Sequence, residues 1–194
     1  MSEARPLLVL GVGNVYYGDE GAGVHLMHYL RTRYAFPDHV DVVDGGTLGW
    51  HLLNLIAEYD HVVLVDAVAA PTGKVYRFGR DDVPSEIGYG KLSSHEWEVP
   101  DLLSAMDLHG DLPDVTITAI GVRPLEFETG EVGAVLSETI RERLGALATV
   151  VLRELEAHGV TVSDRDTTIR PDEPFDTEAI VMGAIAAQEE LAHA

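Results

Sequence analysis

The 194-residue sequence contains no cysteine, and this absence excludes several classes of protein. Without thiols the chain can form no disulfide bond, bind no metal through thiolate and act as no cysteine protease. No apolar run approaches the ~20 residues that a membrane-spanning helix needs, so we expect no membrane as a partner. Residues 1–6 also lack the apolar segment of a secretory signal. These absences are typical of a cytoplasmic protein, and we expect that location.

Basic residues are scarce as well. The chain has 13 Lys and Arg against 33 Asp and Glu, which gives a formal charge of −20. A surface of this sign repels polyanions, so we expect no nucleic acid as a partner. The excess of acids is best interpreted as a solvated surface that favours solubility, and adaptation to high salt is the alternative.

What the sequence does contain is an alternation of apolar strands and amphipathic helices. Apolar residues make up 46% of it, which favours a globular fold. Continuous apolar runs predict strands, and apolar residues at helical spacing predict helices. The expected strands are 7–11, 40–44, 61–66, 74–78 and 115–121; the expected helices are 20–34, 47–59, one beginning near 94, and 133–158. This alternation predicts a three-layer α/β fold: a twisted, mostly parallel sheet of about five strands with helices on both faces.

Three regions follow from composition. Residues 1–162 are expected to form the α/β domain. Residues 163–176 are polar and acidic with two prolines, and they are typical of a linker. Residues 177–194 have a helical pattern, and their apolar stripe is expected to pack on the domain or to meet a partner.

Carboxylates follow three of the expected strands. Glu20 lies in the loop after the first strand, Asp44 ends the second and Asp66 ends the third. The carboxyl ends of parallel strands meet at one edge of a sheet, where ligands bind in this class of fold. Because gathered carboxylates repel one another, their grouping is favourable only where a cation offsets the charge. Each acid taken singly has an ordinary interpretation as a cap or a turn residue.

The loop after the first strand also resembles half of a dinucleotide fingerprint. Gly11 and Gly13 match it, but Tyr16 stands where the third glycine belongs. Asp19 and Glu20 would lie where the pyrophosphate should bind, and they would repel it. A nucleotide-binding module is therefore a weaker interpretation than a cation site.

A divalent metal held by carboxylates often takes an imidazole too, and His95 is the best candidate. It lies in a polar segment before an expected helix, from which a loop can bring it to the same edge. The other histidines are expected to be structural, because they lie within helices, before strands or near helix ends: His25, His28, His39, His51, His61, His109, His158 and His193.

Five motifs in order resemble those of hydrogenase maturation proteases. They are Gly11-Val12-Gly13-Asn14 with Gly18-Asp19-Glu20-Gly21-Ala22-Gly23-Val24, then Asp44-Gly45-Gly46-Thr47, Val65-Asp66-Ala67, Ser93-Ser94-His95 and Gly121-Val122-Arg123-Pro124. The resemblance covers residues 7 to 160. Arg123 stands where this family often has glutamine, and the tail after residue 163 has no recognised counterpart.

The resemblance implies a function and a set of site residues. The function is removal of the C-terminal extension from a nickel-loaded large-subunit precursor of nickel–iron hydrogenase. Glu20, Asp66 and His95 match the positions that bind nickel, and the nickel is carried by the precursor. Asp44 is a candidate to orient water or substrate, with Gly45, Gly46 and Thr47 lining the approach. The runner-up interpretation is a metal-sensing scaffold that binds the precursor without cutting it.

Overall fold

The computed structural model describes residues 6–47, 51–79, 113–122, 135–166 and 168. Its strands are β1 (Leu7–Val12), β2 (Tyr34–Ala35), β3 (Val40–Gly46), β4 (His61–Ala69), β5 (Val75–Gly79), β6 (Asp114–Val122) and β7 (Ser163–Asp164). Its helices are the short 3-10 helix η1 (Gly18–Gly21) and the α-helices α1 (Ala22–Arg33), α2 (His51–Ile56) and α4 (Glu138–Ala157).

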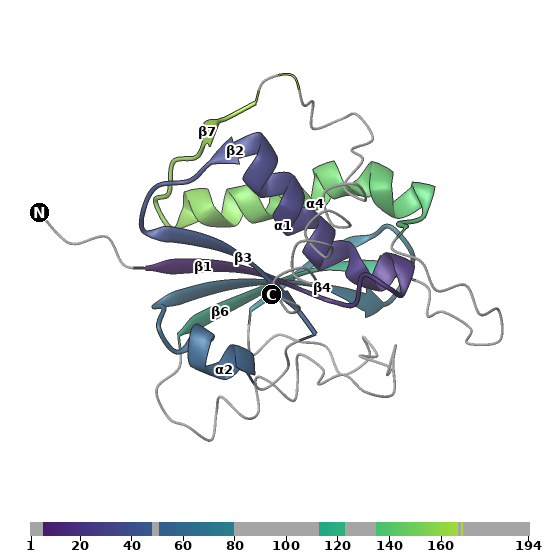
Figure 1. The fold of residues 1–194 in the computed structure, drawn as a ribbon, viewed down its shortest axis with the longest axis horizontal. Coiled ribbons are helices and arrows are strands. Elements are labelled where there is room, and N and C mark those ends of the chain that lie inside the picture. Colours follow the sequence, from purple (N-terminus) through teal and green to yellow (C-terminus); the bar gives the residue numbers. More distant parts are fainter. Residues whose placement is uncertain (1–5, 48–50, 80–112, 123–134, 167, 169–194) are drawn as a thin grey trace, which may run out of the picture.

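The main sheet has five strands in the order β3-β1-β4-β6-β5. The first four are parallel to one another, and β5 pairs antiparallel to β6. Helices α1 and α4 cover one face of this sheet and α2 lies on the other (Figure 1). The expected three-layer α/β fold with a mostly parallel sheet is thus confirmed.

The apolar runs form central strands because both faces of the sheet are covered. Alternate residues of β1 pack into two different cores: Leu7 and Val9 lie on the side of α1 and α4, and Leu8 and Leu10 lie on the side of α2. All four side chains are at most 2% exposed. A strand buried on both faces has no polar alternation, which is why β1 and β4 are continuous apolar runs in the sequence.

Three expected helices have different boundaries in the structure, and the helix expected to begin near 94 lies outside the described residues. The helix expected over 47–59 is α2 and ends at Ile56. The helix expected over 20–34 is divided into η1 and α1, with Gly21 as the residue before α1. The helix expected from 133 begins instead at Glu138, after Ser137. The Ser137 hydroxyl accepts a hydrogen bond from the Ile140 amide at 3.4 Å, which satisfies one of the free donors of the first turn.

The first residues of the expected linker take part in the fold. Ser163 and Asp164 form β7, which pairs antiparallel with β2 directly after α1. The Arg33 guanidinium lies 2.7 Å from the Asp164 carboxylate and reinforces this pairing. The linker from 163 and the helix over 177–194 remain predictions, because residues beyond 168 lie outside the described part of the chain.

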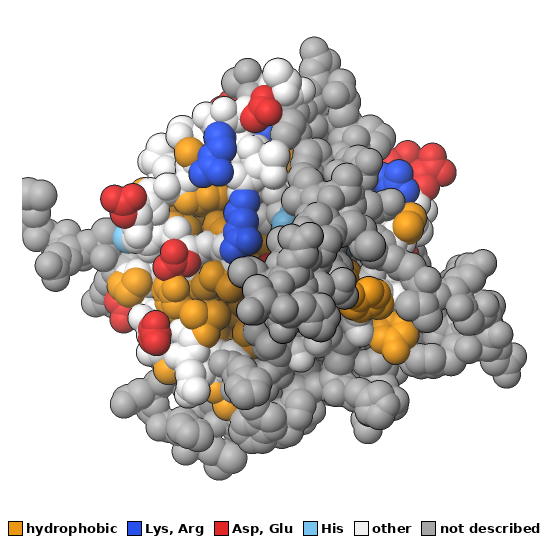
Figure 2. Space-filling model, viewed as in Figure 1, with side chains coloured by type: hydrophobic (Ala, Val, Ile, Leu, Met, Phe, Trp, Pro, Cys, Tyr) orange, Lys and Arg blue, Asp and Glu red, His pale blue; other side chains and the backbone are white. Residues whose placement is uncertain are grey.

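The charged surface is mixed where the structure describes it. On the face drawn in Figure 2, most acidic side chains lie apart from one another, with Lys and Arg side chains between some of them. This arrangement suits the interpretation of the acids as a solvated surface. None of the helices in the described ranges is long and apolar enough to cross a bilayer.

Candidate functional site

The chain path has a topological switch point at the carboxyl ends of the central strands, where open α/β sheets form a crevice. From β1 the chain runs through α1 to β3 on one side, and then through α2, on the opposite face, to β4 on the other side of β1. The connections after β1 and β3 therefore diverge to opposite faces of the sheet. Ligands of open α/β sheets bind where connections diverge in this way.

Glu20 lies at this crevice, in the loop after β1. It belongs to η1, which packs against β4, and only 4% of its surface is exposed. The loop can close so tightly because its glycines carry no side chain: a Cβ on Gly13 would collide with the Glu20 carbonyl, and one on Gly23 with the Val65 carbonyl. Gly13 also has a φ of 134°, which favours glycine. The glycine pattern thus fixes a buried carboxylate beside β4.

Asp66 lies within β4, three residues before its last residue, Ala69. Its carboxylate Oδ1 accepts a hydrogen bond from the Ala67 amide at 2.7 Å. Leu64 and Val68, two residues to either side, belong to the core beneath α2. Because side chains alternate along a strand, Asp66 projects from the same face as these two residues. It is half-buried.

Asp44 projects from the other face of the sheet. Its carboxylate Oδ2 lies 3.1 Å from His28 Nε2 of α1, and its Oδ1 accepts a hydrogen bond from the Gly46 amide at 2.9 Å. Asp44 pairs with Gly11, and Gly11 pairs on its other side with Val65. Asp44 and Asp66 are thus at nearly the same level of the sheet, but their side chains leave it in opposite directions.

The residues after Asp44 end the pairing with β1. The register shifts between the pairs Gly11–Asp44 and Val12–Gly46, so Gly45 forms a β-bulge. A Cβ on Gly45 would lie 2.8 Å from Leu10 Cδ1, so no larger residue fits without movement. Gly46 has a φ of 47°. Thr47 follows and is exposed, so the chain leaves the sheet at this point.

The structure therefore places Glu20, Asp44 and Asp66 at one end of the sheet, as expected from the sequence. It separates Asp44 from Asp66 by the sheet itself, which the sequence analysis did not anticipate. His95 lies outside the described residues, so the triad of Glu20, Asp66 and His95 remains a prediction, as do the roles of Asp44, Gly45, Gly46 and Thr47.

The histidines of α1 were expected to be structural, and the contact of one of them with Asp44 was not predicted. His25 is completely buried, and burial, with a further contribution from His28, lowers its pKa to about 4. His28 is 8% exposed and holds the Asp44 carboxylate. The spacing of three residues puts both on one side of the helix, but only the position of α1 over β3 reveals the partner of His28.

Asp19, next to Glu20, has a structural role at the start of α4. Its carboxylate accepts hydrogen bonds from the backbone amide of Ser137 at 2.6 Å and from its hydroxyl at 2.8 Å. In a capping box, a Glu or Gln side chain at the third position of the helix accepts a hydrogen bond from the backbone amide of the capping residue. Here the third residue is Ile140, whose side chain cannot accept one. Asp19 supplies the missing carboxylate and joins the loop after β1 to the start of α4.

A match to a known protein family decides which family this chain belongs to. The family model described as hydrogenase maturation protease (HycI) matches residues 24–154. The chain belongs to the hydrogenase maturation protease family.

Relatives of this hydrogenase maturation protease align over most of its length. It is 34% identical over 174 residues to the hydrogenase expression/formation protein HupD of Bradyrhizobium diazoefficiens, covering 89% of each chain. It is 34% identical to the hydrogenase 2 maturation protease of Escherichia coli, covering 82% of this chain and 96% of that one. The solved structure of the hydrogenase maturating endopeptidase HybD from E. coli superposes with a TM-score of 0.72 at 32% identity, over 82% of this chain and 98% of HybD.

Proposed function

We propose that this member of the family is an endopeptidase that removes the C-terminal extension of a nickel–iron hydrogenase large-subunit precursor, and that it recognises the nickel already inserted in that precursor. The observation that carries the proposal is the buried Glu20 carboxylate beside β4, the strand that bears Asp66, at the crevice of the sheet. The relatives named for hydrogenase maturation support the choice of substrate.

The donor set suits nickel that arrives with the substrate. Two carboxylates and the imidazole of His95 would offer oxygen and nitrogen ligands, which borderline divalent ions accept. The set contains no thiolate, since the chain has no cysteine. We infer that Glu20, Asp66 and His95 read the metal of the precursor rather than hold a permanent cofactor.

When the precursor is bound, Glu20, Asp66 and His95 would hold its nickel, which would supply a Lewis acid to polarise the scissile carbonyl. The protein then has to orient a water molecule and the peptide. Asp44 is our candidate for this part, with its carboxylate held by His28 and by the Gly46 amide. Gly46 and the exposed Thr47 follow it where the chain leaves the sheet, and the peptide would approach along this segment.

The test mixes the full chain with a nickel-loaded large-subunit precursor from the same organism and follows the mobility of the precursor on a gel. We expect a faster-migrating product with the native chain. Metal-free precursor should stay uncut. Glu20→Gln and Asp66→Asn should abolish the product, and Asp38→Asn, an exposed aspartate between β2 and β3, serves as the matched control. Cleavage of metal-free precursor at the same rate would contradict nickel recognition.

The scaffold interpretation predicts a different result in the same assay. A scaffold would co-purify with the nickel-loaded precursor without changing its mobility, and that outcome would replace the endopeptidase proposal. Asp44→Asn tests the part given to Asp44, because a variant that cleaves at the native rate would remove that assignment. A nucleotide-binding module predicts a thermal shift with nucleotides, and we expect none.

A further inference from the structure

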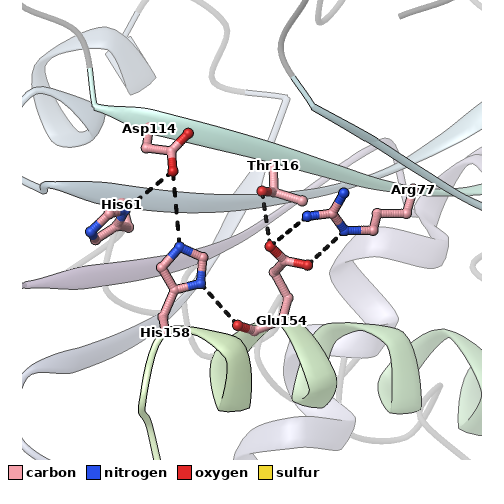
Figure 3. Close-up of polar contacts among 6 residues, drawn as sticks. All are labelled: His61, Arg77, Asp114, Thr116, Glu154 and His158. Atoms are coloured by element: carbon pink, nitrogen blue, oxygen red, sulfur yellow. Dashed lines mark hydrogen bonds and ion pairs between the residues drawn. The ribbon is translucent and has the colours of Figure 1, made fainter. Parts of the chain in front are cut away.

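A second group of metal-binding side chains lies at the opposite end of the sheet from the crevice. His61 begins β4, Asp114 begins β6 and His158 follows the last turn of α4. His61 and Asp114 face each other in the β4–β6 pairing. One nitrogen of each histidine and one carboxylate oxygen of Asp114 lie within 4.8 Å of one another. Figure 3 shows both rings turned toward the Asp114 carboxylate.

The ring of His158 is oriented by a hydrogen bond on its far side. Nδ1 lies 2.9 Å from the backbone carbonyl oxygen of Glu154 (Figure 3). A carbonyl oxygen can only accept, so Nδ1 carries the proton and donates. In the neutral ring Nε2 then has its lone pair free, and it faces Asp114 Oδ2 at 4.0 Å. Metal-binding histidines are held in this way, with the second nitrogen donating to a carbonyl or carboxylate.

The helix end that carries His158 is itself fixed. The Glu154 carboxylate accepts hydrogen bonds from Arg77 Nε at 2.7 Å and Arg77 Nη2 at 2.8 Å. The Thr116 hydroxyl donates to the same carboxylate at 3.1 Å. Since Arg77 lies on β5 and Thr116 on β6, the last turns of α4 are tied to the sheet directly beside the cluster. The Nε2 atom of His158 is thereby positioned before any ion binds.

The distances inside the cluster are too long for hydrogen bonds and suited to a shared ion. His61 Nδ1 is buried, makes no hydrogen bond within the described residues, and lies 3.6 Å from Asp114 Oδ2. Hydrogen bonds of this kind measure about 2.7–3.2 Å. Ligands about 2.0–2.2 Å from a tetrahedral ion lie a little over 3 Å apart. The Asp114 side chain is 68% exposed and can turn to shorten its two distances.

We propose that His61, Asp114 and His158 bind a divalent ion of the zinc type and that this ion fastens the end of α4 to the amino ends of β4 and β6. Two imidazoles and one carboxylate suit zinc, nickel or cobalt better than magnesium or calcium, which prefer oxygen alone. Three protein ligands would leave a fourth position of a tetrahedral ion for water. This site is separate from the precursor-borne nickel of the proposed function and does not depend on it.

The test measures thermal unfolding and the histidine NMR signals of the full chain at neutral pH, with and without zinc chloride. We expect zinc to raise the melting temperature and to shift the ring signals of His61 and His158. Asp114→Asn removes a ligand from an exposed position, so it should fold normally and bind zinc at least about tenfold more weakly. His158→Gln is the second variant and should lose the zinc response as well.

Two matched controls separate this site from others. His39→Gln removes a half-buried histidine from the turn before β3, and Asp66→Asn alters the crevice at the other end of the sheet. His39→Gln should keep the native zinc response, and Asp66→Asn should keep the zinc-dependent shifts of the His61 and His158 ring signals. The proposal is overturned if Asp114→Asn responds to zinc like the native chain, or if the response disappears in Asp66→Asn and persists in Asp114→Asn.

Discussion

At the scale of single residues, His25 and His28 show how position within one helix decides the chemistry of a side chain. They stand three residues apart on α1, and both were expected to be ordinary helix residues. His25 is completely buried under the neighbouring elements, whereas His28 reaches the edge of β3 and meets Asp44. The first affects the stability of the protein and the second affects a candidate catalytic carboxylate.

His25 makes the stability of the fold depend on pH. Its pKa is about 4 in the folded protein, against the ordinary value of 6.5. As pH falls from 6.5 toward 4, the unfolded chain takes up a proton and the folded chain does not. The free energy of unfolding should therefore fall by about 1.4 kcal/mol per pH unit in this window, from this residue alone.

Urea unfolding of the native chain and of His25→Gln between pH 4 and pH 7 measures this effect. The variant should have a smaller slope in the window, and His39→Gln should keep the native slope. An unchanged slope in His25→Gln would show that His25 does not carry this dependence.

The hydrogen bond from His28 bears on the proposed part of Asp44. His28→Ala leaves Asp44 with the Gly46 amide and a wider range of rotamers, so its carboxylate is less often in position. We expect precursor cleavage to slow by about tenfold, as for lost positioning contacts. His28→Gln can still donate to Asp44 and should recover part of the rate. Equal rates in all three chains would mean that His28 does not position Asp44.

The candidate site could be predicted only in part at this scale. The placement of Glu20, Asp44 and Asp66 at one end of the sheet could be predicted, because each lies near the carboxyl end of a strand that was evident from the sequence. Their roles remain predictions. The contact between His28 and Asp44 was missed because it depends on the placement of α1 over β3. The cluster of His61, Asp114 and His158 was missed for the same reason, since each residue alone is an ordinary strand or helix end.

At the scale of elements, α4 is joined to the antiparallel edge of the sheet by one bidentate pair. Arg77 on β5 donates two hydrogen bonds to the buried Glu154 carboxylate of α4. These bonds lower the pKa of Glu154, against the opposing effect of burial. The stability that the pair contributes is complete above the ordinary carboxyl pKa of 4.5, and it is lost as pH falls through the lower folded value.

Removing the guanidinium tests this link. In Arg77→Ala the Glu154 carboxylate stays buried and keeps only the hydrogen bond from the Thr116 hydroxyl among these contacts. In the native protein half of the Arg77 side chain is exposed, so solvent already weakens the ion pair. We expect a loss of about 2 kcal/mol in the free energy of unfolding at pH 7, and a smaller loss near pH 3. Arg153→Ala, at an exposed position of the same helix, should change stability by less than about 0.5 kcal/mol. A loss that does not shrink in acid would contradict an origin in the carboxylate.

Elements with strong periodicity were predicted well, and their ends were not. The five strands of the main sheet were all expected from apolar runs, because central strands are buried on both faces. The start of α4 was placed at 133 instead of 138, since apolar spacing continues before the helix and gives no sign of the cap at Ser137. The division of the first helix into η1 and α1 could not be predicted from spacing. Close backbone contacts are made on either side of it, by Gly13 with the Glu20 carbonyl of η1 and by Gly23 of α1 with the Val65 carbonyl.

At the scale of the whole molecule, the net charge of −20 is carried by a domain of ordinary size. Like charges repel across the surface, and the repulsion is released when the chain expands. Salt screens it, with a screening length of about 10 Å at 0.1 M and about 3 Å at 1 M. Raising sodium chloride from about 0.02 M to about 0.5 M shortens the screening length several-fold. This change should therefore stabilise the fold.

We expect a rise of about 2–4 °C in melting temperature, which corresponds to about 1 kcal/mol for a chain of this length. Replacing the exposed Glu58, Glu142 and Glu156 by glutamine removes three charges, from −20 to −17, and should reduce the rise. A melting temperature that falls with salt would show instead that attractive ion pairs dominate the surface. Differential scanning calorimetry is the measurement.

The class of the whole fold was predictable from the alternation of strands and helices, but the order of the strands was not. Nothing in the sequence says that β1 lies between β3 and β4, or that β5 occupies an edge with reversed direction. These features depend on which faces α1 and α2 cover. They also decide that Asp44 and Asp66 point away from each other. The relative orientation of these two side chains could therefore not be predicted from the sequence.

The bond between Asp19 and Ser137 has a consequence for the time course of synthesis. A ribosome adds about 5–20 residues per second, so Ser137 follows Asp19 by roughly 6–24 s. Throughout that interval the loop that carries Glu20 lacks the residue to which Asp19 bonds in the finished fold. Pulse proteolysis of ribosome-stalled chains should find this loop cut readily in a nascent chain that stops before Ser137 and protected once α4 has emerged. The loop that carries Glu20 would thus gain this contact only after the start of α4 has left the ribosome.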